Sequence, residues 1–297
     1  MNVIKAIDVQ KSYSGVSAVD GVSLSIKKGE IFALIGPNGA GKTTLINCLT
    51  GASSFDSGSI QILNNTPRNV VKSKISLLPQ SFEPPTHLTV SELIIYFSGL
   101  YGIKTDPSTI LKKVGLSSQS NKRFYELSGG QKRRICVGIS IINDPDILFL
   151  DEPTTGIDPA GRFEIWDLIE TMASSGSTIF LTTHYMHEVE RLADRIGVIS
   201  NGKIIATGTP SDLITKFGGD CTLTIKTTSD ISSSFKEFSP SFKGGNLHFN
   251  NIQPNQIGSL LTQIEILNVE YSSLTWNRPS LETVYMELMD NLPGEFL

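Results

Sequence analysis

The chain has 297 residues, of which 39% are apolar and 18% are charged. This balance is typical of a globular protein and excludes a collagen, a coiled coil and a generally disordered chain. The formal net charge is -4, so no overall positive field attracts a phosphate backbone, and nucleic acid is not an expected partner.

Membrane and disulfide signals are also missing from the sequence. No uninterrupted apolar stretch reaches the about 18 residues that span a bilayer, and the first residues do not resemble a secretory signal. The three cysteines, Cys48, Cys136 and Cys221, are odd in number and lack CxxC spacing. We therefore expect reduced thiols in a cytosolic protein, with no membrane span of its own.

Residues 1–217 predict an α/β domain with a mostly parallel sheet, because short β-branched runs alternate with longer helical periods. Two alternating segments near the start, Val22–Ile26 and Gly58–Ile62, predict an additional antiparallel layer. The continuously apolar segments predict central strands at Ile31–Ile35, Ile75–Leu78, Ile147–Leu150, Thr178–Leu181 and Ile196–Ile199.

Strand signals stop between about residues 88 and 144, and this block is expected to be a helical insert. Its predicted helices are Val90–Leu100, Pro107–Val114 and Gly130–Ile142. The pair Gly218-Gly219 indicates a break, after which residues 218–297 are expected to form a small α+β domain. That expectation rests on the segments Thr222–Lys226, Asn255–Ile266, Val269–Ser272 and Pro279–Asp290.

One motif indicates a phosphate site. It matches GxxxxGK(S/T), follows a predicted strand and begins a helical run, which argues against a glycine-rich turn without chemical meaning. Backbone N–H groups of such a loop cradle phosphates, the lysine reaches the β- and γ-phosphates, and the hydroxyl serves Mg²⁺. The expected site consists of Gly36, Pro37, Asn38, Gly39, Ala40, Gly41, Lys42, Thr43 and the next residue, Thr44.

Two carboxylates, Asp151 and Glu152, follow the predicted buried strand at Ile147–Leu150. Neighbouring side chains on a strand point to opposite sides, so the two are expected to have different roles. Asp151 is suited to hold Mg²⁺, and Glu152 to orient and polarise an attacking water. A solvated acidic turn is the alternative, and the nearby phosphate motif disfavours it.

With Leu127-Ser128-Gly129-Gly130-Gln131, which matches the LSGGQ signature, the chain resembles the ATPase subunits of ABC transporters from Val3 to Leu213. The resemblance implies ATP and Mg²⁺ as cofactors. It implies that Tyr13 stacks on adenine, although this residue could instead cap the β-layer. Further implied roles are a catalytic loop glutamine at Gln80, a switch histidine at His184, and a dimer-communication aspartate at Asp158. For Mg²⁺, the implied residues are Thr43, Gln80 and Asp151.

The same resemblance implies partners. Two subunits, expected to be identical, would pack head to tail, so that Ser128, Gly129, Gly130 and Gln131 of one meet the ATP of the other. A separate transmembrane permease would carry the cargo, and the ATPase would lie on the cytoplasmic face of the membrane. The helical insert and the Gln80 loop form the expected docking surface for the permease. Leu93–Phe97 could contribute to it, although core packing is the favoured role for most of this segment.

Several details resemble daunorubicin-resistance ATPases and the A subfamily of eukaryotic ABC proteins, which are exporters. These are Tyr125–Leu127, Lys132–Arg134, and Pro279–Tyr285, which is similar to a PSLEDVF segment. Apart from this likeness, Lys132–Arg134 is interpreted as a solvated basic face. Residues 218–297 carry no motif for chemistry and are interpreted as a structural or dimer-stabilising appendix.

Four other interpretations are less well supported by the sequence. An ATPase of the same family that acts on nucleic acid or ribosomes is disfavoured by the acidic balance and the single cassette. The ATPase subunit of an importer is disfavoured weakly by the C-terminal segment. An inactive cassette is opposed by Glu152. A zinc site of His184, His187 and Glu188 is disfavoured because their order matches no zinc motif.

Overall fold

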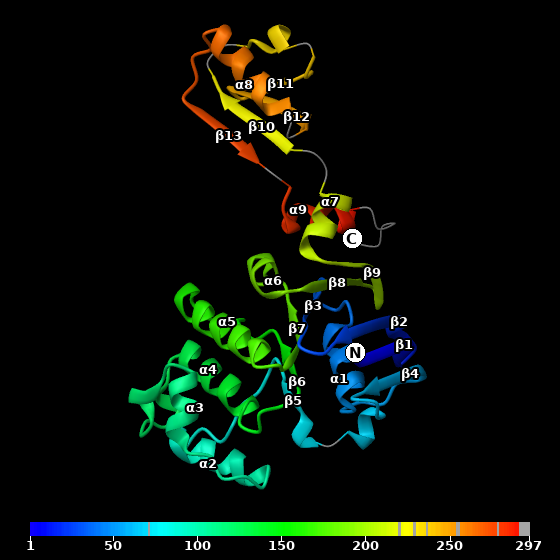
Figure 1. Ribbon diagram of the computed structural model, residues 1–297, viewed down its shortest axis with the longest axis vertical. Coiled ribbons are helices and arrows are strands. Elements are labelled where there is room, and N and C mark those ends of the chain that lie inside the picture. Colours follow the sequence, from blue (N-terminus) through cyan, green and yellow to red (C-terminus); the bar gives the residue numbers. More distant parts are fainter. Residues whose placement is uncertain are drawn as a thin grey trace. The chain divides into compact units, whose positions relative to one another are not determined.

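The computed structural model describes residues 1–70, 72–218, 221–227, 230–235, 237–253, 256–277 and 279–290. The chain forms two compact units, Met1–Pro210 and Ser211–Leu297 (Figure 1). Each unit has its own sheet and its own hydrophobic core. Among the described residues, no helix has both the length and the apolar character needed to cross a membrane.

The centre of the first unit is a six-stranded sheet in the order β5-β6-β7-β3-β8-β9. All of its neighbouring strands are parallel except β8 and β9. Its strands are β3 (Ile31–Ile35), β5 (Ile75–Leu78), β6 (Ile147–Asp151), β7 (Thr178–Thr183), β8 (Arg195–Ser200) and β9 (Lys203–Gly208). Every residue of β3, β6 and β7 is buried, as expected for central strands covered on both faces.

A second, fully antiparallel sheet in the order β2-β1-β4 forms the predicted additional layer. It consists of β1 (Asn2–Tyr13), β2 (Val16–Lys27) and β4 (Ser57–Ile62). Its strands bury only part of their residues, so the layer has one covered face. The main core of the unit is enclosed by this layer, helix α1 (Lys42–Thr50) and the parallel sheet.

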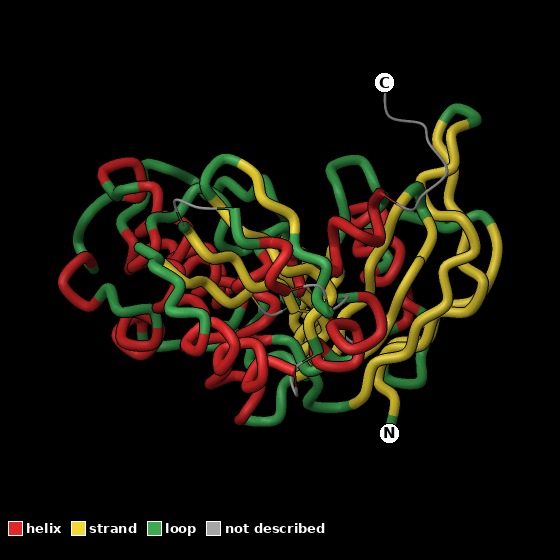
Figure 2. The backbone as a smooth tube through the Cα atoms, turned by 90° about the horizontal axis from the view of Figure 1, so that it is seen from above, coloured by secondary structure: helices red, strands yellow, loops and turns green. Residues whose placement is uncertain are grey.

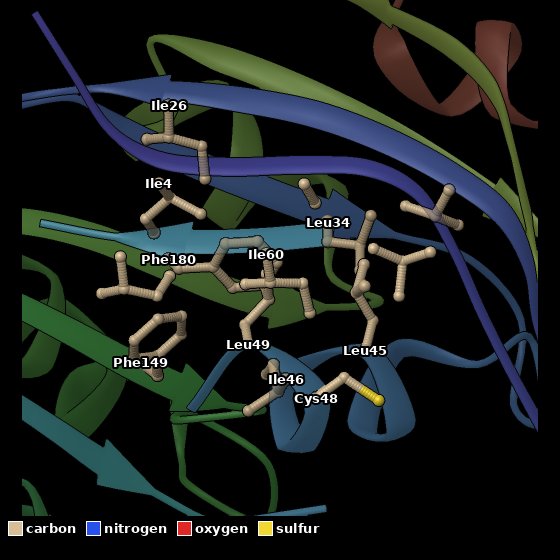
Figure 3. Packing of buried hydrophobic residues seen from close by; sticks show 14 of the residues in the cluster. Ile4, Ile26, Leu34, Leu45, Ile46, Cys48, Leu49, Ile60, Phe149 and Phe180 are labelled. Carbon is tan, nitrogen blue, oxygen red and sulfur yellow. The ribbon is translucent and has the colours of Figure 1, made fainter. Parts of the chain in front are cut away.

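Figure 3 shows how side chains from all three sources meet in this core. Ile4, Ile26 and Ile60 come from the antiparallel layer, Ile46 and Leu49 come from α1, and Phe149 and Phe180 come from the central strands. The Phe180 ring lies between Phe32 and Phe149, with ring centroids 5.7 Å from each. Tight packing of α1 against two sheets therefore fixes the loop that precedes α1.

The helical insert consists of α2 (Val90–Leu100), α3 (Pro107–Lys113) and α4 (Gly129–Ser140), which lie together on one side of the unit in Figure 1. Helices α2 and α4 both begin with a capping box, formed by Thr89 with Glu92 and by Ser128 with Gln131. The remaining helices are α5 (Pro159–Ser174) and α6 (Met186–Leu192), and the alternation of helices and strands can be followed in Figure 2. Single 3₁₀ turns lie at Pro67–Asn69, Lys72–Lys74, Ser117–Gln119 and Phe124–Glu126.

The second unit has an antiparallel sheet in the order β11-β12-β10-β13. Its core contains side chains of β10, β12 and α8. The elements are α7 (Pro210–Phe217), β10 (Cys221–Lys226), a 3₁₀ turn (Ser232–Phe235), β11 (Ser241–Lys243), β12 (Asn246–Ile252), α8 (Ile257–Ile266), β13 (Ser273–Asn277) and α9 (Leu281–Asp290).

Two details of this unit differ from the sequence-based expectation. The boundary between units falls after Pro210, not after residue 217, because the end of α7 lies against the segment before α9: a Cβ at Gly218 would be 2.7 Å from the Cβ of Pro279. The segment Val269–Ser272 precedes strand β13 and is not itself a strand. Gly219 and Asn255, at the predicted break and the predicted helix start, lie outside the described residues.

Replacing the central aromatic ring of the first core should destabilise the protein strongly. We expect Phe180→Ala to lower the free energy of unfolding by about 3–5 kcal/mol, because it leaves a cavity between two fixed rings. Phe163→Ala is the matched control, since Phe163 is 52% exposed on α5 and should cost less than about 1 kcal/mol. Urea unfolding followed by circular dichroism measures both, and equal losses would contradict this account of the core.

Candidate functional site

The loop from Gly36 to Gly41 joins β3 to α1 and passes very close to neighbouring backbone. Gly41 has φ +102°, and a Cβ there would lie 2.1 Å from the carbonyl oxygen of Ala18. A Cβ at Gly36 would lie 2.2 Å from the carbonyl oxygen of Ile199. Glycine is required at both positions, since any side chain would push the loop away from β2 and β8.

Lys42, the first residue of α1, is buried and points its ammonium group back into the loop. Its Nζ donates hydrogen bonds to the carbonyl oxygens of Gly36 at 2.8 Å and Pro37 at 3.0 Å. Burial lowers the pKa of Lys42, and the carboxylates of Glu152 and Asp151 act in the opposite direction. The loop thus holds a cation at a helix N-terminus that no side chain caps, and this arrangement favours an anion.

A cavity of about 290 Å³ opens at this loop. Its lining brings together residues that are far apart in the sequence: Ala18, Asn38, Gly39, Gly41, Lys42, Thr43, Thr44, Gln80 and Glu152. Sequence reasoning missed Ala18, because only the tertiary approach of β2 to the loop distinguishes it from other alanines. Tyr13, the predicted adenine platform, does not line this cavity; it lies half-exposed at the end of β1, with Lys11 Nζ 5.2 Å from its ring centroid.

Asp151, at the C-terminal end of β6, and Thr43 lie next to each other in a geometry that suits Mg²⁺. Thr43 Oγ1 donates to Asp151 Oδ2 at 2.8 Å, and the Thr182 hydroxyl donates to the other carboxylate oxygen. Hydroxyl and carboxylate oxygens are hard ligands of the type that Mg²⁺ takes, usually together with waters and phosphates. The residues present therefore fit the predicted ion, with Gln80 nearby in the same cavity.

Glu152 is the point on which three other side chains converge. Its Oε2 accepts hydrogen bonds from Gln80 Nε2 at 3.3 Å and from Thr155 Oγ1 at 2.9 Å, and His184 Nδ1 lies 3.5 Å away. Its backbone has φ +49°, a conformation that is uncommon for a residue other than glycine. The backbone N–H of Glu152 donates to Thr182, which helps to hold this conformation. The three predicted catalytic residues thus lie together.

The signature residues form the N-terminus of α4, where Ser128 is the cap. Gln131 N–H donates to Ser128 Oγ, and Ser128 N–H donates to Gln131 Oε1. None of the residues Ser128–Gln131 lines the phosphate-loop cavity. Asp158 caps α5, and a Cβ at Gly130 would lie 3.3 Å from its carboxylate, so Asp158 is next to the signature of its own chain.

A second cavity, of about 350 Å³, lies between the loop after β5 and the first turns of α4. It is lined by residues of that loop, of α4 and of the segment after β6: Gln80, Phe82, Glu83, Thr86, Phe124, Gly129, Lys132, Arg133, Cys136, Glu152, Thr155 and Gly156. Gln80 and Glu152 line both cavities. The site and the start of the signature helix are therefore connected through two side chains.

The interpretation of Lys132–Arg134 as a solvated basic face is wrong for Arg134, whose side chain is only 14% exposed and forms an ion pair with Glu164, and also for Arg133. The Arg133 guanidinium donates hydrogen bonds to main-chain carbonyl oxygens of Pro79, Gln80, Asp151, Glu152 and Pro153. A helical period alone does not reveal this, because the acceptors belong to loops that only the sheet brings next to α4. No sequence signal except its place in the signature helix could have identified it.

The zinc interpretation finds no support in the geometry. Glu188 is fully buried, and its Oε1 accepts hydrogen bonds from Thr154 and Trp166, while the His187 side chain is exposed and lies beside Glu190. Burial raises the pKa of Glu188. Within the part of the chain that the structure describes, no three His, Cys, Asp or Glu side chains gather in a way that could hold a metal ion.

The fold and this site define a P-loop nucleotide-binding protein, because a glycine-rich loop between a parallel strand and a helix holds a buried lysine beside a strand-end carboxylate pair. The family model described as ABC transporter matches residues 19–155. The chain is 33% identical to the linearmycin resistance ATP-binding protein LnrL of Bacillus subtilis, over 96% of this chain and 98% of that protein.

The chain belongs to the ABC transporter family, as an ATP-binding and ATP-hydrolysing subunit. It is 41% identical to the Nod factor export ATP-binding protein I of Paraburkholderia xenovorans, over 69% of this chain and 70% of that protein. A solved ATP-binding cassette of an ABC transporter in its ADP conformation is 28% identical, with a TM-score of 0.64; the match covers 73% of this chain and 94% of the cassette.

Removing the buried lysine should weaken nucleotide binding. We expect Lys42→Ala to raise the Kd for ATP by about 10- to 100-fold, because it removes a charge-assisted contact to the phosphates. Lys113→Ala is a suitable control, since Lys113 is an exposed residue at the end of α3. Titration calorimetry measures both affinities. Unchanged binding by Lys42→Ala would show that this loop is not the phosphate site.

Proposed function

We propose that this protein powers export through a separate transmembrane permease, by closing a dimer around ATP and opening it after hydrolysis. The observation that carries the proposal is the single cavity in which Lys42 and Thr43 of the phosphate loop face Gln80 and Glu152. A triphosphate bound to the loop would place its terminal phosphate beside a carboxylate that is already oriented by three neighbours.

Each residue of the site then has a role in hydrolysis. Glu152 orients and polarises the attacking water, and Gln80 and His184 hold that carboxylate and the water in position. Thr43, Asp151 and Gln80 would hold Mg²⁺, which neutralises charge on the phosphates when it is bound. The exposed ring face of Tyr13 offers a stacking platform for adenine, which needs no hydrogen-bonding partner.

The separation of the two phosphate-binding helix ends supports a dimer, and the complete set of site residues in each chain supports a homodimer. The N-terminus of α4, with Ser128, Gly129, Gly130 and Gln131, lies outside the cavity of its own phosphate loop. Packed head to tail, each chain would offer this second N-terminus to the ATP of the other. Asp158, next to Gly130, is placed to communicate between the two sites. ATP then favours closure, and loss of the γ-phosphate reverses it.

The helical insert offers a docking surface for the permease. The predicted segment Leu93–Phe97 divides into a buried part, Leu93 and Ile94, and an exposed part. The exposed large apolar side chains of the insert include Ile95 at 57%, Tyr96 at 47%, Leu100 at 65%, Ile103 at 38% and Tyr125 at 52%. Exposed apolar side chains of this size often indicate a protein interface. A permease bound there would hold the protein at the cytoplasmic face of the membrane.

The names of two similar proteins favour export over import and over action on nucleic acid. One curated relative is named for resistance and another for export. The net charge of -4 does not favour an alternative partner such as nucleic acid. Residues 218–297 carry no sequence motif for ATP chemistry and are proposed to be a structural or dimer-stabilising appendix.

Neutralising the proposed catalytic carboxylate should separate hydrolysis from binding. We expect Glu152→Gln to reduce kcat by at least about 100-fold, since a general base is removed, and to accumulate an ATP-bound dimer. Glu170→Gln is the control, because Glu170 lies on the outside of α5 with Arg191. A phosphate-release assay and light scattering provide the two measurements. Hydrolysis at the original rate in Glu152→Gln would refute the assignment.

Shortening the chain should leave nucleotide binding intact. A protein of residues 1–218 keeps α7 and every residue that lines the two cavities. We expect its Kd for ATP to remain within about twofold of that of the full chain, a difference below 0.5 kcal/mol. If a folded fragment binds no ATP, the second unit completes the site, and its proposed role as an appendix is wrong.

A further inference from the structure

Arg133 makes an unusual set of contacts for a residue of a helix surface. Its Nε donates to the carbonyl oxygen of Pro153 at 2.9 Å. Its Nη1 donates to Pro79 at 3.3 Å and to Gln80 at 3.2 Å, and its Nη2 donates to Asp151 at 2.9 Å and Glu152 at 2.8 Å. All five acceptors are main-chain oxygens, so the guanidinium holds backbone positions and leaves the side chains of these residues available for chemistry.

Four of the five acceptors belong to two loops, and the fifth, Asp151, is the last residue of β6. One loop follows β5 and carries Gln80, and the other follows β6 and carries Glu152. The strands β5 and β6 are parallel neighbours, with Leu78 opposite Leu150, so the loops leave the same edge of the sheet side by side. Across them, Gln80 Nε2 and Glu152 Oε2 form one hydrogen bond of 3.3 Å. Arg133 joins the same two loops through the backbone.

Satisfying buried carbonyl groups would be a sufficient role for an arginine at a strand end. Two observations point further. The acceptors include Gln80, Asp151 and Glu152 themselves, and Glu152 has a backbone φ of +49°, which persists in proteins only where the surroundings hold it. Arg133 also extends from the first turns of α4, whose N-cap is Ser128 of the signature.

We infer that Arg133 is a positioning residue for ATP hydrolysis: it fixes the Gln80 loop and the Glu152 backbone at one separation and ties both to the signature helix. The inference rests on the proposed roles of Gln80 and Glu152. Without the guanidinium, the 3.3 Å hydrogen bond from Gln80 Nε2 to Glu152 Oε2 still joins the two loops, but the backbone that carries the Glu152 carboxylate is held less firmly. A displacement of about 1 Å at a reacting group can cost about 100-fold in rate.

Substitution of Arg133 in the full-length protein tests the inference. We expect Arg133→Gln to lower kcat by at least about tenfold while the Kd for ADP stays within about twofold, because Lys42 and its loop are untouched. The kcat of Arg133→Lys should lie between that of the original protein and that of Arg133→Gln, because an ammonium group has three donors at one point and cannot reach five acceptors. The matched control is Arg191→Gln, whose guanidinium binds the surface carboxylates of Asp167 and Glu170; its kcat should not change.

A double-mutant cycle with Gln80→Ala measures whether the effects of the two residues on kcat depend on each other. An arginine that only stabilises the fold would show no such dependence. If Arg133 acts by holding the Gln80 loop against Glu152, the double variant should lose less activity than the product of the two separate losses. Thermal unfolding of each variant, recorded beside kcat, shows whether lost activity follows lost folded protein.

Several outcomes would overturn the inference. They are an unchanged kcat in Arg133→Gln, a loss of kcat that matches the loss of ADP binding, independent effects in the cycle, and failure of both variants to fold, which would assign Arg133 to folding alone. The Glu152→Gln variant distinguishes a failure of the proposed function from a failure of the role of Arg133. If that variant still hydrolyses ATP, the proposed function fails. If it does not, while the Arg133 variants hydrolyse normally, only the role of Arg133 is wrong.

Discussion

Parallel strand pairing is the constraint on which the whole site depends. Leu78 lies opposite Leu150, Asp151 opposite Thr182, and Thr183 opposite Ile35, so four strands end at the same edge of one sheet. The phosphate loop, the Gln80 loop, the carboxylate pair and His184 each follow one of these strand ends. Segments that are more than 100 residues apart in the sequence therefore meet without any long excursion of the chain.

The charged side chains at this edge of the sheet are largely shielded from solvent. The overall charge of -4 says nothing about the site, where the buried Lys42 and the partly buried Arg133 lie near the buried carboxylates Asp151 and Glu152. Both cations are held by backbone carbonyl oxygens, and neither depends on a salt bridge for its position. Such an arrangement leaves the carboxylates free to serve an ion and a water, and it leaves the lysine able to meet a phosphate.

Gln80 and Glu152 line both cavities of the site, so they connect the phosphate loop with the signature helix. One cavity opens at the phosphate loop, and the other lies against the signature helix. A change at either one reaches the same pair of side chains, and Arg133 couples that pair to α4 through the backbone. In the proposed dimer beside a permease, events at the signature and at the insert would affect hydrolysis at this pair of side chains.

The sequence by itself determined the class of fold, the phosphate loop, the signature and the central strands, because each of these depends on local pattern: glycine spacing, an apolar run, a cap such as Ser128. Glu152 was predicted from its position at a strand end, whereas Gln80 and His184 were predicted from the resemblance to ABC transporter ATPases. Only the tertiary structure decided that Ala18 lines the cavity, that Arg133 donates to five main-chain carbonyl groups, and that the first unit ends at Pro210. These features depend on which loops lie side by side in the folded chain, and a local sequence pattern does not show which distant loops become neighbours.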